Sequence, residues 1–79
     1  MNLREQARAI VSRALAEAGD PQSFGDADSL VVSGRLSSLD VVSVLTSLEE
    51  AFDFEMSPDD FDPLHFDSVD AIVALLESR

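Results

Sequence analysis

The chain has 79 residues, no cysteine and a formal net charge of −11, because 16 acidic residues oppose only 5 basic ones. A chain of this length makes one small domain, its lack of cysteine excludes disulfides and thiolate metal sites, and its acidity disfavours nucleic acid and anionic lipid as partners. No apolar run is long enough to span a membrane and no signal-peptide pattern opens the sequence, so we expect a monomeric cytoplasmic protein. The acidity favours partners with basic patches, although an acidic surface that serves only solubility explains the composition equally well.

A first helix is expected over about residues 2–18, where apolar side chains recur at helical spacing from Leu3 to Ala18. Gly19 suits the position just after a helix, and Asp20-Pro21 does not continue one. The segment 20–37 has no sustained period, and we interpret it as a long loop held by apolar anchors. These anchors are Phe24, Leu30, Val32 and Leu36.

The strongest periodicity predicts a second helix over about residues 38–52. Ser37 before it is a good N-cap, and Asp40 is placed to complete a capping box. Ser38 is then the first helical residue, and its hydroxyl lies among backbone N–H groups that have no partner within the helix. A phosphate ester on this hydroxyl would lie at the positive end of the helix dipole, which makes Ser38 a candidate attachment point. The inward positions of this helix are Val41, Val44, Leu45, Leu48 and Phe52.

Two further helices are expected. Ser57-Pro58-Asp59-Asp60 has the pattern of a helix start and predicts a short helix over about 58–61, which Asp62-Pro63 ends. The last helix covers about 68–78, is capped by Asp67 or Ser68, and buries an apolar stripe. Residues 1–79 are therefore predicted to form one all-α domain, a bundle of three main helices plus one short helix. The buried stripe of the last helix consists of Val69, Ile72, Val73 and Leu76.

Two apolar residues of the second helix do not belong to its buried stripe. At 100° per residue, Leu39 lies about 160° and Val42 about 100° from Val41 on the helical wheel. Glu49 and Glu50 lie further along the same helix. An exposed apolar pair with carboxylates nearby suits a docking surface, although single exposed Leu or Val residues are ordinary.

The run Asp-Ser-Leu-Val-Val-Ser-Gly-Arg-Leu-Ser-Ser-Leu at residues 28–39 resembles the attachment region of the acyl carrier proteins. Leu-Glu-Glu-Ala-Phe at 48–52 resembles the end of that family's second helix, and residues 66–72 resemble the entry to its last helix. The resemblance implies an acyl-carrier-like fold, and it implies that the protein is a carrier and not an enzyme. By this resemblance Ser38 accepts 4′-phosphopantetheine from coenzyme A, and Leu39, Val42, Glu49 and Glu50 contact partner enzymes.

The implied partners are a phosphopantetheinyl transferase and the acyl-loading and acyl-transferring enzymes, which would dock through basic patches. Ser37 stands where the family usually has Asp, and this exchange keeps an N-cap but removes a negative charge beside Ser38. Ser43 and Thr46 also depart from the usual pattern, which indicates a specialised fatty-acid, lipid or polyketide pathway. The alternatives are an aminoacyl or peptidyl carrier protein, and an unmodified acidic helical adaptor.

Other candidate sites are weaker. Ser29 stands in a literal Asp-Ser-Leu, but the residues after it open no helix. His65 is the only histidine, and no serine–histidine nucleophile pair can be assembled around it. Two groups of aspartates lack the glycine and glutamate offsets of an EF-hand, so we expect no metal site and no catalytic residue. These groups are Asp26 with Asp28, and Asp59 with Asp60 and Asp62.

Overall fold

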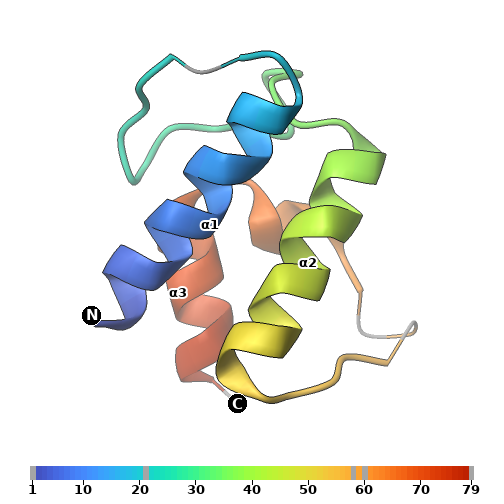
Figure 1. Ribbon diagram of the computed structural model, residues 1–79. Helices are drawn as coiled ribbons and strands as arrows, with labels where there is room; N and C mark the ends of the chain where they lie inside the picture. The colour runs from blue at the N-terminus through green and yellow to red at the C-terminus, as the bar shows by residue number, and fades with distance from the viewer. Residues whose placement is uncertain (1, 21, 58, 60, 79) are drawn as a thin grey trace.

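The computed structural model describes residues 2–20, 22–57, 59 and 61–78 and contains three α-helices and one 3-10 helix. α1 spans Leu3–Glu17, α2 spans Ser38–Phe52, η2 is the 3-10 helix Pro63–Phe66, and α3 spans Val69–Glu77. α1 packs against both α2 and α3, while η2 contacts α2 and α3 (Figure 1). The described residues include no β-strand, so the prediction of an all-α bundle with three main helices and one short helix is confirmed.

The core is formed by apolar side chains from all four helices and from the long loop between α1 and α2. Phe66 of η2 is fully buried, and so are Leu48 of α2 and Ile72 of α3. The aromatic rings that are not fully buried pack against this core from its edges. The remaining core residues are Ala7, Val11, Ala14, Leu15, Leu30, Leu36, Val41, Val44, Val69 and Val73.

α1 ends as the sequence predicts, at Gly19. This glycine has φ +87°, a conformation that side-chain-bearing residues rarely adopt. Its N–H donates to the carbonyl of Ala16 at 3.1 Å, and the N–H of Asp20 donates to the carbonyl of Leu15 at 2.8 Å. These two bonds make a Schellman motif, which satisfies carbonyls at the helix end and turns the chain into the long loop.

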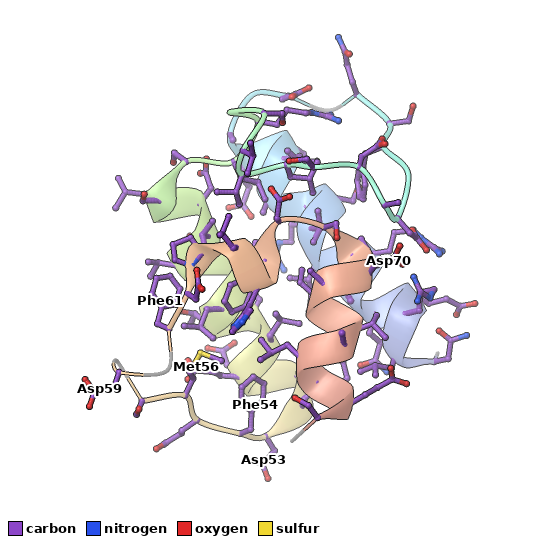
Figure 2. The ribbon with its side chains drawn as sticks, turned by 180° about the vertical axis from the view of Figure 1, so that it is seen from behind. Asp53, Phe54, Met56, Asp59, Phe61 and Asp70 are labelled. Atoms are coloured by element: carbon purple, nitrogen blue, oxygen red, sulfur yellow. The ribbon has the colours of Figure 1, made fainter. Side chains whose placement is uncertain are left out.

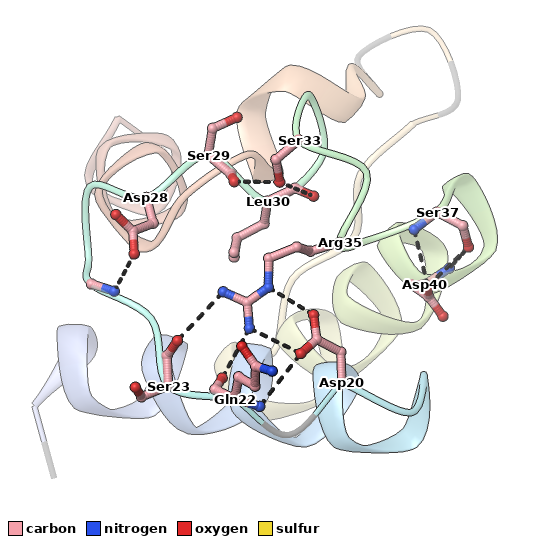
Figure 3. A network of polar contacts seen from close by, with 11 residues as sticks. Asp20, Gln22, Ser23, Asp28, Ser29, Leu30, Ser33, Arg35, Ser37 and Asp40 are labelled. Carbon is pink, nitrogen blue, oxygen red and sulfur yellow. Dashed lines mark hydrogen bonds and ion pairs between the residues drawn. The ribbon is translucent and has the colours of Figure 1, made fainter.

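Arg35 ties the two ends of the long loop to each other through an ion pair and two backbone carbonyls, as Figure 3 shows. The Arg35 guanidinium donates to the Asp20 carboxylate at 2.8 and 3.3 Å, and to the carbonyls of Gln22 at 2.9 Å and Ser23 at 3.5 Å. These four bonds hold the start and the end of the loop together.

A second cluster of ion pairs joins the middle of the loop to α1 and α3. Asp26 accepts from Arg8 at 2.8 and 2.9 Å and from Arg4 at 3.0 Å. Arg4 also donates to Asp70 at the start of α3, and the N–H of Asp70 donates to the carbonyl of Asp26 at 3.0 Å. The long loop is therefore fastened to both α1 and α3.

The apolar anchors expected in this loop are only partly confirmed. Leu30 and Leu36 are buried in the core, and Phe24 packs against it. Val32 is wrong as an anchor, because its side chain is 73% exposed. Its N–H donates to the Asp67 carboxylate at 2.9 Å, so the chain is held here by its backbone and not by the side chain.

The short helix expected at about 58–61 includes Pro58 and Asp60, which lie outside the described residues. Asp59 between them is in 3-10 conformation and Phe61 and Asp62 are not helical, while η2, which the sequence did not predict, begins directly at Pro63. Asp62 N-caps η2, accepting the N–H of Leu64 at 3.0 Å, and Pro63 is its first residue. Proline fits that position because a helix leaves its first N–H groups unpaired.

The connection from α2 to η2 begins at Asp53, which caps α2 in the left-handed conformation with φ +52°. Phe54, Met56 and Phe61 then turn their side chains toward the bundle (Figure 2). The rings of Phe61 and Phe66 lie 5.8 Å apart between centroids. None of the helices in the described residues is long and apolar enough to cross a membrane.

Candidate functional site

Ser38 is exposed and is the first residue of α2. Ser37 before it has extended backbone, and its carbonyl accepts the first helical hydrogen bond from Val41 at 3.0 Å. The N–H groups of Ser38 and Leu39 precede the first helical hydrogen bond and have no acceptor among the described residues. The Ser38 hydroxyl is thus presented to solvent beside two free backbone donors.

The capping box predicted from Ser37 and Asp40 is confirmed. The Ser37 Oγ accepts the N–H of Asp40 at 3.3 Å, and the Asp40 carboxylate accepts both the N–H and the hydroxyl of Ser37 at 2.9 Å (Figure 3). Both side chains are therefore committed to the helix start. This box fixes the backbone on either side of Ser38 without using the Ser38 hydroxyl.

The apolar residues expected outside the core are exposed. Leu39 is 81% exposed and Val42 is 48% exposed, although Val41 between them is fully buried. They follow Ser38 directly on α2, so apolar area is available next to the exposed serine. Two exposed apolar residues that the sequence did not single out for docking are Val32 of the loop and Leu64 of η2.

The two glutamates near the end of α2 differ in their surroundings. Glu50 is exposed, whereas Glu49 is partly buried and its Oε2 accepts the N–H of Met56 at 2.9 Å. Glu49 thus also serves as a cap for the segment after α2. A shallow hollow at this end of α2 is lined by both glutamates together with Thr46, Asp53, Phe54 and Glu55.

Asp53 and Glu55 extend this acidic surface beyond the helix, and helical periodicity did not point to them. Their proximity depends on the left-handed turn at Asp53, where the chain leaves the helix axis. The available signal was the run of acidic residues that continues past Phe52.

Arg35 is the basic residue nearest to Ser38 in sequence, but it does not neutralise the start of α2. Its guanidinium is held by Asp20 and two carbonyls, and its hydrogen bond to Asp20, with help from the N–H of Gln22, keeps the pKa of the Asp20 carboxyl below its usual range. Arg4 and Arg8 are likewise paired with Asp26, whose pKa is lowered to about 2 by hydrogen bonds from Arg8 and then Arg4 that outweigh the opposing effect of burial. Arg35, Arg4 and Arg8 are therefore committed to carboxylates outside α2.

The alternative serine, Ser29, is engaged in a different way. Its hydroxyl donates to the Asp67 carboxylate at 2.9 Å, and the residue is only partly exposed. It lies in the long loop and not at a helix start. This hydroxyl supports the loop and is less available for modification than that of Ser38.

The remaining candidates do not converge on a further site. Asp26 binds arginines, and Asp28 accepts the N–H of Gly25 at 2.7 Å. His65 is exposed on η2 beside the buried Phe66. Across residues 2–20, 22–57, 59 and 61–78, no three His, Asp or Glu side chains are arranged to hold a metal ion.

The geometry at Ser38 fits a phosphate ester. The hydroxyl is exposed, two free N–H groups flank it, and the positive end of the α2 dipole faces it. The family model described as "Phosphopantetheine attachment site" matches residues 5–76, which is most of the chain. Domains of this family are non-catalytic carriers to which 4′-phosphopantetheine is attached covalently. No curated protein and no solved structure matches the chain.

Proposed function

This chain belongs to the family of phosphopantetheine attachment domains, and we propose that Ser38 is the residue that carries its arm. The observation that supports this choice is the start of α2, where an exposed hydroxyl stands beside the unpaired N–H groups of Ser38 and Leu39. The competing hydroxyl of Ser29 is bound to Asp67. A phosphodiester at Ser38 would extend into solvent, as a swinging arm requires.

We further propose that the cargo is an acyl group, held as a thioester on the terminal thiol of the arm. The net charge of −11 and the acidic end of α2 favour this assignment over an aminoacyl or peptidyl carrier. The departures at Ser37, Ser43 and Thr46 favour a specialised fatty-acid, lipid or polyketide pathway. The protein itself would present the thioester to successive enzymes.

Partner enzymes would dock on α2. Leu39 and Val42 supply exposed apolar area next to the arm, and Glu50 supplies an exposed carboxylate further along the helix. Glu49 adds charge, although its carboxylate also accepts the N–H of Met56. A phosphopantetheinyl transferase or acyl-transferring enzyme with a basic patch would be attracted to this face and would cover the apolar pair on binding.

The attachment site is tested by intact mass. The apo chain is incubated with coenzyme A, magnesium and a broad-specificity phosphopantetheinyl transferase, beside Ser38→Ala and the control Ser29→Ala. We expect one phosphopantetheine on the wild type and on Ser29→Ala, and none on Ser38→Ala. A gain that persists in Ser38→Ala would reject this serine, and no gain on the wild type with several transferases would favour an unmodified adaptor.

The cargo is tested on the chain recovered from the cells that encode it. After rapid quenching, the mass of the thioester-bound group is read before and after cleavage with hydroxylamine. A fatty-acyl or β-ketoacyl mass is expected. An amino-acid or peptide mass would reject the acyl assignment while leaving the attachment site intact.

A further inference from the structure

Asp67, between η2 and α3, forms hydrogen bonds with four consecutive residues of the long loop. Its Oδ1 accepts the hydroxyl of Ser29 at 2.9 Å, the N–H of Val31 at 2.8 Å and the N–H of Val32 at 2.9 Å. Its carbonyl accepts the N–H of Leu30 at 2.7 Å. The loop is therefore attached to Asp67 through both its side chain and its backbone.

The Asp67 carboxylate is suited to this role. Its partial burial disfavours the charged form, but the N–H of Val32, the hydroxyl of Ser29 and the N–H of Val31 together hold its pKa below the usual range. All three side-chain bonds end on the same oxygen, Oδ1. An asparagine at this position has an equivalent oxygen and could keep the geometry, whereas an alanine could not.

Beyond these contacts a backbone hydrogen bond between Leu36 and Leu30 closes the loop, and the chain then continues directly into α2. The N–H of Leu36 donates to the carbonyl of Leu30 at 2.8 Å, and both side chains are buried. The hydroxyl of Ser33 donates to the carbonyl of Ser29 at 2.7 Å, as Figure 3 shows. Ser37, the N-cap of α2, follows Leu36 without an intervening residue. A shift of residues 29–32 would thus be passed to the start of α2 through the Leu30–Leu36 closure.

The backbone of Asp67 is held between η2 and α3. Its N–H donates to the carbonyl of Leu64 at 3.3 Å at the end of η2. Ser68 after it N-caps α3, accepting the N–H of Ala71 at 3.0 Å. The carboxylate therefore projects from a junction whose backbone is fixed on both sides.

We propose that Asp67 is a positioning residue for phosphopantetheine transfer, which sets the location of Ser38 by fastening residues 29–32 to the junction of η2 and α3. The proposal rests on Ser38 being the attachment residue. In the transfer, the Ser38 oxygen bonds to the phosphorus that bears the pantetheine arm and the P–O bond of the coenzyme A diphosphate breaks. The hydroxyl proton passes to the transferase or to water, and adenosine 3′,5′-bisphosphate leaves. An attack of this kind depends on the placement of the oxygen, and a misplacement of about 1 Å can cost about 100-fold in rate.

The test compares the transfer kinetics of Asp67→Ala, Asp67→Asn and Ser29→Ala with those of the wild type. Val73→Ala is the matched control, because it removes buried apolar volume from α3 and leaves the Asp67 hydrogen bonds to the loop in place. All variants are assayed at a temperature at which circular dichroism shows them fully folded. A range of apo-chain concentrations at a fixed transferase concentration gives kcat and KM separately.

We expect Asp67→Ala to lower kcat about 10-fold with KM nearly unchanged, because the oxygen is misplaced while the α2 docking face is retained. Asp67→Asn should recover most of this loss, and Ser29→Ala should lower kcat only slightly. Val73→Ala should be modified at the wild-type rate. If Asp67→Ala does not fold, a kcat of Ser29→Ala below that of Val73→Ala supports the inference, and a kcat equal to it overturns the inference.

Three outcomes would overturn the inference. Wild-type kinetics in Asp67→Ala would show that the contact does not position Ser38. An equal loss in Asp67→Ala and Val73→Ala would reduce its role to stability. No mass gain on the wild-type chain would reject the proposed function and the inference together, whereas the first two outcomes leave the proposed function standing.

Discussion

Ser37 and Asp40 cap each other at the start of α2, with each side chain accepting the backbone N–H of the other at 3.3 and 2.9 Å. Between them, Ser38 keeps an exposed hydroxyl that neither partner uses. The pair thus satisfies two helix donors and still leaves the candidate attachment point open to an incoming transferase.

Replacing Ser37 tests the contribution of this cap to stability. Ser37→Ala should lower the free energy of unfolding by about 1 kcal/mol, because the N–H of Asp40 loses its acceptor. Ser37→Asp should stay within a few tenths of the wild type, since Asp and Ser cap helices comparably. Urea unfolding followed by circular dichroism measures both. An equally large loss in Ser37→Asp would mean that the hydroxyl bond to the Asp40 carboxylate matters more than the cap.

Leu39→Ala should separate docking from folding. Because this side chain is 81% exposed, its loss should change the free energy of unfolding by less than about 0.5 kcal/mol. Burial of a leucine against a partner contributes roughly 1.5–3 kcal/mol, so kcat/KM for phosphopantetheine transfer should fall about 10-fold. Leu64→Ala, at a residue 57% exposed on η2, is the control and should be modified normally. A wild-type rate for Leu39→Ala would remove Leu39 from the docking surface.

Asp53→Gly should stabilise the protein. Asp53 caps α2 at φ +52°, where a side chain costs energy that glycine does not incur. After allowance for the greater freedom of glycine in the unfolded chain, we expect a gain of about 0.5 kcal/mol. The converse change Gly19→Ala should lose about 1–2 kcal/mol, because Gly19 has φ +87°. Thermal unfolding that moves both variants in the same direction would contradict the argument.

The ion pairs of Asp26 should make stability depend on pH. Its pKa is lowered from 3.8 to about 2, so its contribution is complete above the usual pKa and is lost as the pH falls through the folded value. Asp26→Asn should therefore lower the melting temperature at pH 7, and the difference from the wild type should shrink below about pH 4 and vanish only below about pH 2.

The control for this prediction is Arg8→Gln, which removes the partner that lowers the pKa of Asp26 most. It should also weaken the pH dependence between pH 4 and pH 2. A difference between wild type and Asp26→Asn that is the same at pH 7 and pH 2 would show that the amide harms packing and that the charge is not responsible.

The local features of this protein are readable in its sequence. The capping box of Ser37 and Asp40, the Gly19 stop and the outward direction of Leu39 each depend on residues within one or two helical turns. Spacing and side-chain chemistry are sufficient at this range, because the helix itself fixes the geometry between neighbours. The helix start at Asp62 and Pro63 was missed, although the local rule that was applied to Ser57 and Pro58 fits it equally well.

The contacts that place the loop were decided only by the tertiary structure. Arg4 pairs with Asp70 across 66 positions, and Ser29 binds Asp67 across 38 positions. With 16 acidic residues in the chain, the sequence offers each arginine and each hydroxyl many equivalent partners. The periodicity of the helices therefore specified which faces are buried and that α2 begins at Ser38. The packing of α1, η2 and α3 determined which carboxylates hold the loop, because that choice depends on distances that are set only when the helices pack together.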